Sequence, residues 1–187
     1  QKRKKMIETV LWSAIALIAI AFIFDFTNGF HDAANSIATV VATKTLTPLQ
    51  AVSMAAFFNF IVMFFISFKV AAVIGKGIVD PTSVTMFVVF GCLAGAIVWN
   101  LITWWLGMPT SSSHALIGSL VGAAVIANGW SVVIEDGLFK ILTFIVAAPI
   151  IGFVLGASIN TVIRNICNTE SEIHDKWFRR LQLFSSA

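Results

Sequence analysis

Charged residues are scarce in this chain of 187 residues. Asp, Glu, Lys and Arg together make up 11% of the sequence, whereas hydrophobic residues make up 58%, and the mean hydropathy is +0.93. A chain with so little polar surface does not fold as a water-soluble domain. The composition therefore predicts an integral membrane protein with the lipid bilayer as its surroundings.

Cysteine is rare and tyrosine is absent. The two cysteines, Cys92 and Cys167, fall in different segments without metal-ligand spacing, so we predict two small packing residues and no disulfide. Basic residues gather in residues 2–5 and 164–180, on either side of the apolar block. This placement is typical of membrane topology and not of a nucleic-acid surface, so no nucleic-acid partner is expected.

Apolar segments alternate with short polar breaks along the chain. An apolar helix needs about 20 residues to cross a bilayer core of about 30 Å. The pattern predicts an all-α polytopic membrane protein in which residues 1–163 form one transmembrane repeat. Residues 164–187 mix charged and apolar side chains, which predicts either an amphipathic helix on the membrane surface or a linker. The expected long spans are residues 7–24, 48–68, 85–105 and 138–163, and a shorter helix is expected over residues 33–42.

The first polar break carries two carboxylates, directly after an apolar run. Each carboxylate costs about 2.5 to 3.5 kcal/mol near the bilayer centre, so the pair requires water, a partner or a cation. Asp25, Asn28, Asp32 and Asn35 are spaced by three, four and three residues, which places them on one face of a helix. Gly29 permits a break, and we predict a broken helix near residues 25–35 that forms a cation site. The alternative is a soluble loop.

A second motif, Gly-Met-Pro-Thr-Ser-Ser-Ser-His, occupies residues 107–114. Hydroxyl and free N–H groups in the first turn of a helix favour an oxyanion such as phosphate or sulfate. We predict a re-entrant helical hairpin near residues 107–128 that carries this tip into the membrane. The alternative is an ordinary capped helix at the membrane interface. The expected anion ligands are Thr110, Ser111, Ser112 and Ser113.

Two further polar side chains, His114 and Asn100, leave their roles open. His114 either contacts the substrate and exchanges protons or orients the serine tip. Asn100 serves either helix packing or the site. Ser112 and His114 also suggest a hydrolase, but they lie two residues apart with no orienting acid near them, so we expect no enzyme. An ion channel would place similar groups in the membrane, and saturable flux distinguishes a transporter from it.

The two motifs together resemble the signatures of the inorganic phosphate transporter (PiT) family, in its bacterial low-affinity branch, over nearly the whole chain. The resemblance implies a multi-pass transporter of the cell (inner) membrane that moves inorganic phosphate by secondary active symport with sodium or protons. It also implies two inverted-topology repeats and a homodimer. The alternative within the same fold is a sulfate permease. No cofactor is expected beyond the transported ions.

The resemblance also suggests roles for individual residues. Asp32 and Asn35 match an Asp-x-x-Asn motif, which implies a coupling-cation role for Asp32 and phosphate contact by Asn35. Asp25 and Asn28 join the cation site by spacing alone. His31 stands where many relatives have Asn, and this departure resembles the branch thought to move protons or neutral metal-phosphate complexes. Sodium or proton coupling, free or metal-bound phosphate and a resident metal therefore stay open.

Each motif occurs once in the chain, whereas the family carries two copies. We therefore expect a first, N-terminal repeat, which is one half of an inverted-repeat transporter and needs the second repeat as its partner. A half-size transporter that dimerises is the alternative. The basic N-terminus disagrees with the orientation that the resemblance implies, so the orientation of the N-terminus also stays open.

Overall fold

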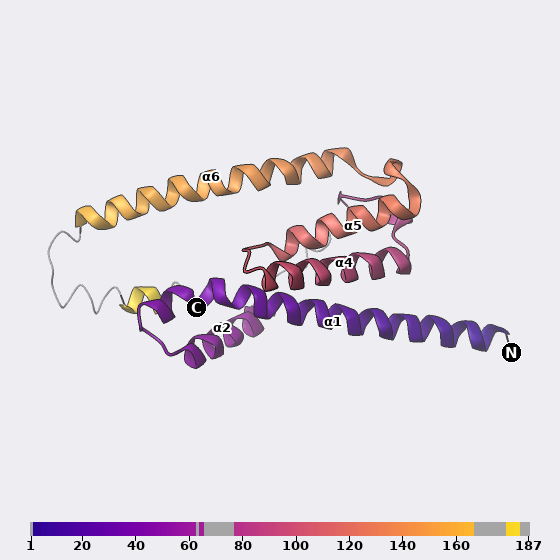
Figure 1. The fold of residues 1–187 in the computed structure, drawn as a ribbon, viewed down its shortest axis with the longest axis horizontal. Coiled ribbons are helices and arrows are strands. Elements are labelled where there is room, and N and C mark those ends of the chain that lie inside the picture. Colours follow the sequence, from indigo (N-terminus) through magenta and orange to yellow (C-terminus); the bar gives the residue numbers. More distant parts are fainter. Residues whose placement is uncertain (1, 63, 66–76, 167–178, 184–187) are drawn as a thin grey trace. The chain divides into compact units, whose positions relative to one another are not determined.

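The computed structural model describes residues 2–62, 64–65, 77–166 and 179–183, and these are almost entirely helical (Figure 1). Within these ranges no β-strand forms, although Val79 and Val133 make an isolated bridge. The all-helical class that the sequence predicts is confirmed. The elements are α1 (Lys2–Ala42), α2 (Pro48–Val62), η1 (Pro81–Ser83), α4 (Met86–Trp105), α5 (Ser112–Asn128), η2 (Trp130–Val132) and α6 (Glu135–Ile166).

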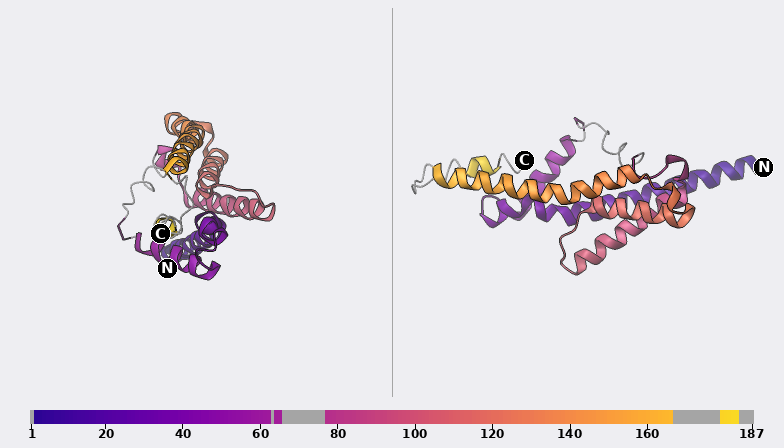
Figure 2. Two further views of the ribbon diagram at one scale, coloured as in Figure 1. Left: turned by 90° about the vertical axis from the view of Figure 1, so that its left-hand side faces the viewer. Right: turned by 90° about the horizontal axis from the view of Figure 1, so that it is seen from above.

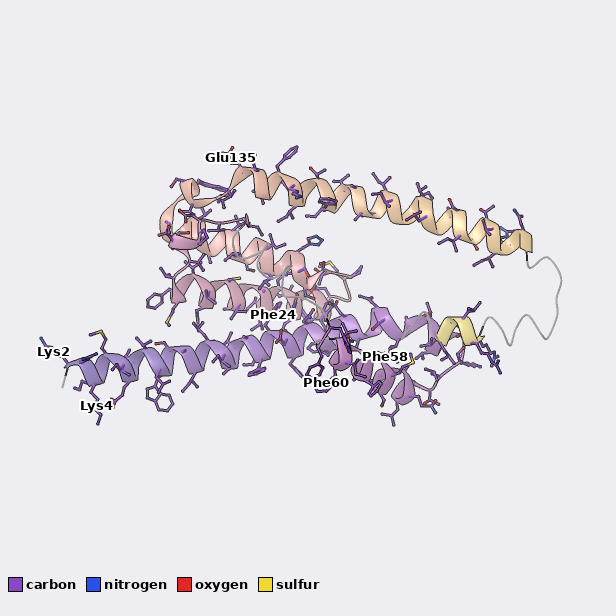
Figure 3. The ribbon with its side chains drawn as sticks, turned by 180° about the vertical axis from the view of Figure 1, so that it is seen from behind. Lys2, Lys4, Phe24, Phe58, Phe60 and Glu135 are labelled. Atoms are coloured by element: carbon purple, nitrogen blue, oxygen red, sulfur yellow. The ribbon has the colours of Figure 1, made fainter. Side chains whose placement is uncertain are left out.

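Among the described residues, three helices, α1, α4 and α6, are long and apolar enough to cross a membrane. The predicted spans over residues 7–24, 85–105 and 138–163 lie in these helices, whereas α2 and α5 are shorter. Large apolar side chains such as Phe22 and Phe26 are exposed along α1. Lys2 and Lys4 lie at its N-terminal end (Figure 3). Outward apolar surface of this kind is suited to lipid.

The predicted break in the first helix is wrong for this structure. Helix α1 runs without interruption for 41 residues, through both Asn28 and Gly29. A glycine inside a helix costs only about 1 kcal/mol relative to alanine, and no proline lies nearby to remove a backbone hydrogen bond. Thr27 also bonds back to the helix, since its hydroxyl donates to the carbonyl of Phe24 at 2.8 Å. The polar residues therefore lie on a continuous helix.

The chain divides into two compact units, and the first combines residues 1–32 with residues 67–138. Its centre is a hairpin in which α4 and α5 lie side by side (Figures 1 and 2). Small residues permit this close approach. A Cβ atom on Gly95 would lie 3.0 Å from the Ser119 hydroxyl, and one on Gly91 would lie 3.3 Å from the Ala123 Cβ. The hairpin in the structure is thus formed by α4 and α5, and the predicted re-entrant hairpin near residues 107–128 stays a prediction.

Local capping fixes the ends of the hairpin helices. Thr85 caps α4 by accepting from the N–H of Val88, and Ser111 caps α5 by accepting from the N–H of His114. Gly107 turns the chain at the tip with a φ of 66°, a left-handed conformation that favours glycine. The tip of the hairpin, residues 106–111, therefore leads directly into the first turn of α5. One face of α4 is buried along its length and comprises Val88, Cys92, Ala96, Asn100 and Thr103.

The second unit combines residues 33–66 with residues 139–187. Helix α2 starts at Pro48 as predicted, because Thr47 and Gln50 form a reciprocal cap in which each side chain accepts from the other's backbone N–H. The hydroxyls of Thr43 and Thr45 reach Gln182 at 3.2 and 3.3 Å. Most of the segment predicted over residues 164–187, Cys167 and the expected end of the second span lie outside the described residues.

Candidate ion-binding site

The two sequence motifs meet where α1 contacts the start of α5. The Ser112 hydroxyl donates to Asp32 Oδ2 at 3.0 Å, across 80 positions of sequence. Ser112 is buried, with 4% of its surface exposed, because α5 begins against α1. The carboxylate motif and the serine motif therefore form one site within the first unit.

His31 connects the same region to α4. Its Nε2 lies 3.5 Å from the hydroxyl of Thr103, which also lies 2.9 Å from the carbonyl of Trp99. A hydroxyl has one proton, so a Thr103 hydroxyl that donates to the backbone carbonyl accepts from the Nε2–H of His31. The other ring nitrogen, Nδ1, is then directed at Asp32, with 3.9 Å between Nδ1 and Oδ1. His31 thus bridges α4 and the carboxylate.

Aromatic packing holds this junction. The ring of Phe30 meets that of Trp104 edge to face, with centroids 5.4 Å apart. Such pairs contribute about 0.5 to 1.5 kcal/mol beyond their buried area. The side chain of His31 is 8% exposed, whereas that of Asp32 is 46% exposed. One oxygen face of the carboxylate therefore stays accessible to an ion while the neighbouring imidazole is fixed.

A separate open pocket of about 580 Å³ lies on another side of the same tip. Trp99 shapes it by donating its indole N–H to the Thr110 hydroxyl at 3.3 Å. Its polar lining of hydroxyl, imidazole and indole groups suits an oxyanion. The residues around the pocket are Trp99, Pro109, Thr110, Ser111, His114, Ala115, Gly118 and Ser119.

The predicted anion ligands therefore separate into two groups. Ser112 is directed at Asp32, whereas Thr110 and Ser111 line the pocket together with His114. Ser113 is exposed. The Ser112 hydroxyl donates to Asp32 and not to His114.

The predicted cation ligands also separate. Asp32 bonds to the hairpin, while Asp25, two turns earlier on α1, is exposed and Asn28, one turn earlier, is half-buried. Asn35 is exposed and belongs to the second unit. In the part of the chain that the structure describes, no three His, Cys, Asp or Glu side chains gather as metal ligands. Of the two carboxylates on the predicted helix face, Asp32 is thus the one that bonds to the hairpin.

Sequence reasoning missed three side chains at this site. Thr103 contacts His31, Trp99 contacts Thr110, and Ser119 lines the pocket. Asn100, whose role the sequence left open, is buried on α4. The sequence signal for Thr103 is its helix-face spacing, since Cys92, Ala96 and Asn100 recur every four residues and Thr103 follows three residues later. That repeat is typical of packing and does not by itself indicate a site.

Known proteins resemble this chain closely. A family model described as the phosphate transporter family matches residues 28–186. A probable low-affinity inorganic phosphate transporter of Rhizobium meliloti is 48% identical over 174 residues, which cover 92% of this chain and 52% of the relative. A protein of the same description from Bacillus subtilis is 42% identical, covering 96% of this chain and 55% of the relative.

A solved structure described as the sodium-dependent phosphate transporter is also similar. It superposes with a TM-score of 0.75 at 30% identity, over 81% of this chain and 39% of that structure. The chain spans about half the length of the two curated relatives. These relatives are named as transporters and not as enzymes. The family-model match over residues 28–186 and the identity to the curated relatives lead to one conclusion: the chain belongs to the phosphate transporter family.

Proposed function

We propose that this chain is the first half of a cation-coupled symporter of inorganic phosphate in the bacterial cell membrane. One observation carries the proposal: the hydrogen bond from Ser112 to Asp32, which joins the anion motif of the hairpin to the carboxylate of α1. The family match and the named phosphate transporters support phosphate as the substrate. The sodium-dependent structural neighbour supports coupling to a cation, either sodium or a proton.

Phosphate binds at the pocket side of the hairpin tip. Ser111 and Thr110 offer hydroxyl groups there, and His114 offers an imidazole. Because Ser111 already caps the N–H of His114, the N–H groups of Ser112 and Ser113 are the free donors of the first turn. The partial positive charge of a helix N-terminus adds to their attraction for an oxyanion. Phosphate is held either free or as a metal-phosphate complex.

The coupling cation binds at Asp32. Its carboxylate lies at the tip of the hairpin and is partly open, with Ser112 and His31 on either side. A sodium ion would take oxygen ligands here, whereas a proton would be shared between His31 and Asp32. Asn35, Asn28 and Asp25 extend this polar face of α1 toward the partner half of the transporter.

Cation binding and phosphate binding are coupled because neighbouring serines serve both: Ser111 lines the pocket and Ser112 bonds to Asp32. The cation reduces the cost of holding phosphate near a carboxylate, and phosphate reduces the cost of holding a cation in a dry site. Rocking of the hairpin and α1 against the second repeat would then open the loaded site to each side of the membrane in turn. The second repeat, in inverted topology, and a homodimeric partner complete the assembly.

Labelled-phosphate uptake into proteoliposomes tests this function. The full-length transporter should take up phosphate saturably when a sodium or a proton gradient is imposed, with each gradient varied separately. Competition by equal sulfate would move the substrate assignment to sulfate, and unsaturable flux would indicate a channel. Residues 1–187 alone, demonstrated to be monomeric, should give no saturable uptake, since they supply only one hairpin and one carboxylate cluster.

A further inference from the structure

The side chain of Asn100 is buried in the first unit without a polar partner. It is 1% exposed, and neither Oδ1 nor Nδ2 has a hydrogen-bond partner among the described residues. A buried carboxamide that is left unpaired loses its hydration and gains nothing in return. Native structures hold few such groups, and each requires an explanation, such as an ion or water that completes it.

The position of Asn100 brings it to the ion site. It lies one helical turn before Thr103, whose hydroxyl contacts His31. In the hairpin, Gly95 faces Ser119 and Gly91 faces Ala123, so each step along α4 is matched by a step back along α5. This register places Asn100 level with the first turn of α5, the turn that begins with Ser112.

The site that Thr103 joins to α4 is rich in oxygen and carries negative charge. Asp32 supplies a carboxylate, and Ser112 and Thr103 supply hydroxyls. Among the described residues, His31 is the basic side chain that lies within ion-pair distance of Asp32. Carboxylate, carbonyl and hydroxyl oxygens are the ligands that hard metal cations prefer. A phosphate in the same position would instead meet the charge of Asp32.

We propose that the Asn100 carboxamide is a further ligand of the coupling site, whose Oδ1 binds a monovalent metal cation together with Asp32. This inference rests on the proposed function. It explains why a polar residue occupies the buried face of α4, where Cys92 and Ala96 pack the turns before it. It also favours a metal ion, and not a proton alone, as the coupling cation.

The decisive variant is Asn100→Leu, tested in the full-length transporter with sodium as the probe. Leucine keeps the volume and removes the oxygen ligand. We expect the sodium concentration for half-maximal phosphate uptake to rise by at least about tenfold, the effect of losing one favourable polar contact in a dry site. The phosphate concentration for half-maximal uptake at saturating sodium should stay within about threefold of the wild type.

Asn128→Leu is the matched control, because Asn128 lies at the other end of the hairpin, where its amide donates to the Ser83 carbonyl. It should leave the sodium dependence unchanged. If Asn100 only packs, Asn100→Leu should instead raise the thermal unfolding temperature and leave the sodium dependence intact, which would overturn the inference. A selective change in phosphate affinity would likewise overturn it and assign Nδ2 to the anion.

Asn100→Asp covers the case in which the leucine variant does not reach the membrane. A carboxylate at this buried position requires a cation, so sodium should raise its unfolding temperature more than that of the wild type. An equal or smaller rise would overturn the inference. Wild-type phosphate uptake that depends on protons and not on sodium would also overturn it while leaving phosphate symport intact, whereas absence of wild-type phosphate uptake would refute the proposed function itself.

Discussion

The two ends of the α4–α5 hairpin treat their polar groups in opposite ways. At the base, Asp80 accepts from the N–H and hydroxyl of Thr82, and Ser83 donates back to the carbonyl of Asp80. These partners lie two or three residues apart. At the tip, Ser112 bonds to Asp32 across 80 positions, and Asn100 has no partner among the described residues.

This difference separates polar residues that shape the chain from those that we propose to hold ions. A polar group that is satisfied by its own neighbours fixes a turn or a cap and has no capacity left for a ligand. A polar group that stays buried and unpaired costs free energy unless something else completes it. The tip therefore should control transport, while the base should control only stability.

The largest effect is expected at Asp32. Asp32→Asn in the full-length transporter should abolish coupled phosphate uptake, because it removes the charge that attracts the cation while it keeps the shape of the side chain. Asp25→Asn, on the same helix but exposed, should retain most of the uptake. Proteoliposome uptake with matched protein insertion measures both, and wild-type uptake by Asp32→Asn at every cation concentration would contradict the site.

A smaller effect is expected from the serine tip. The double variant Ser111→Ala, Ser112→Ala should weaken phosphate binding by about 1 to 3 kcal/mol, because it removes the Ser111 hydroxyl from the pocket and the Ser112 bond that joins Asp32 to the tip. Isothermal calorimetry on the purified full-length protein measures the dissociation constant. Ser113→Ala, which changes an exposed side chain, is the control. An unchanged constant in the double variant would reject contact through these hydroxyls, while the backbone N–H groups would remain as ligands.

The packing of α4 on α5, between the two ends of the hairpin, should be sensitive to side-chain size at the contact. Gly95→Leu should destabilise the hairpin by about 1 to 3 kcal/mol, because a Cβ atom at this position would lie 3.0 Å from the Ser119 hydroxyl. Gly122→Leu is the matched control, since nothing lies within 4 Å of a Cβ atom at that position. Thermal unfolding in detergent compares them, and equal unfolding temperatures would argue against close packing of α4 on α5.

The smallest effect is expected at the base. The hydrogen bonds from the N–H and hydroxyl of Thr82 hold the pKa of Asp80 below its ordinary value of 3.8. A lowered pKa in the folded state means that Asp80 stabilises the fold above about pH 4 and loses this contribution as the pH falls through the lowered value. The difference in unfolding temperature between the wild type and Asp80→Ala should therefore be small, constant near neutral pH and reduced in acid.

Transport provides the second measurement on that variant. Phosphate uptake by Asp80→Ala at neutral pH should equal that of the wild type, since the base holds no ion. A loss of uptake without a loss of folded protein would show that the two ends of the hairpin do not differ in the way that their hydrogen bonds indicate.

Local patterns were sufficient to predict most helices and caps. The apolar runs predicted α4 and α6 to within a few residues, and Thr47 before Pro48 marked the start of α2. Local patterns could not predict whether the helix breaks at Gly29. A glycine permits a break but does not force one, and the cost of about 1 kcal/mol is small beside the hydrogen bonds of a helix as long as α1.

By itself, the sequence determined the membrane-spanning helical class, the hairpin and the two polar motifs, because hydropathy, capping and spacing act within a few turns of chain. Only the tertiary structure decided which groups meet. It paired Asp32, and not Asp25, with Ser112, turned Thr110 and Ser111 toward a separate pocket, and buried Asn100 without a partner. Helix-face spacing makes all these polar residues equivalent, and they become different only when another helix packs against some of them and leaves the others exposed.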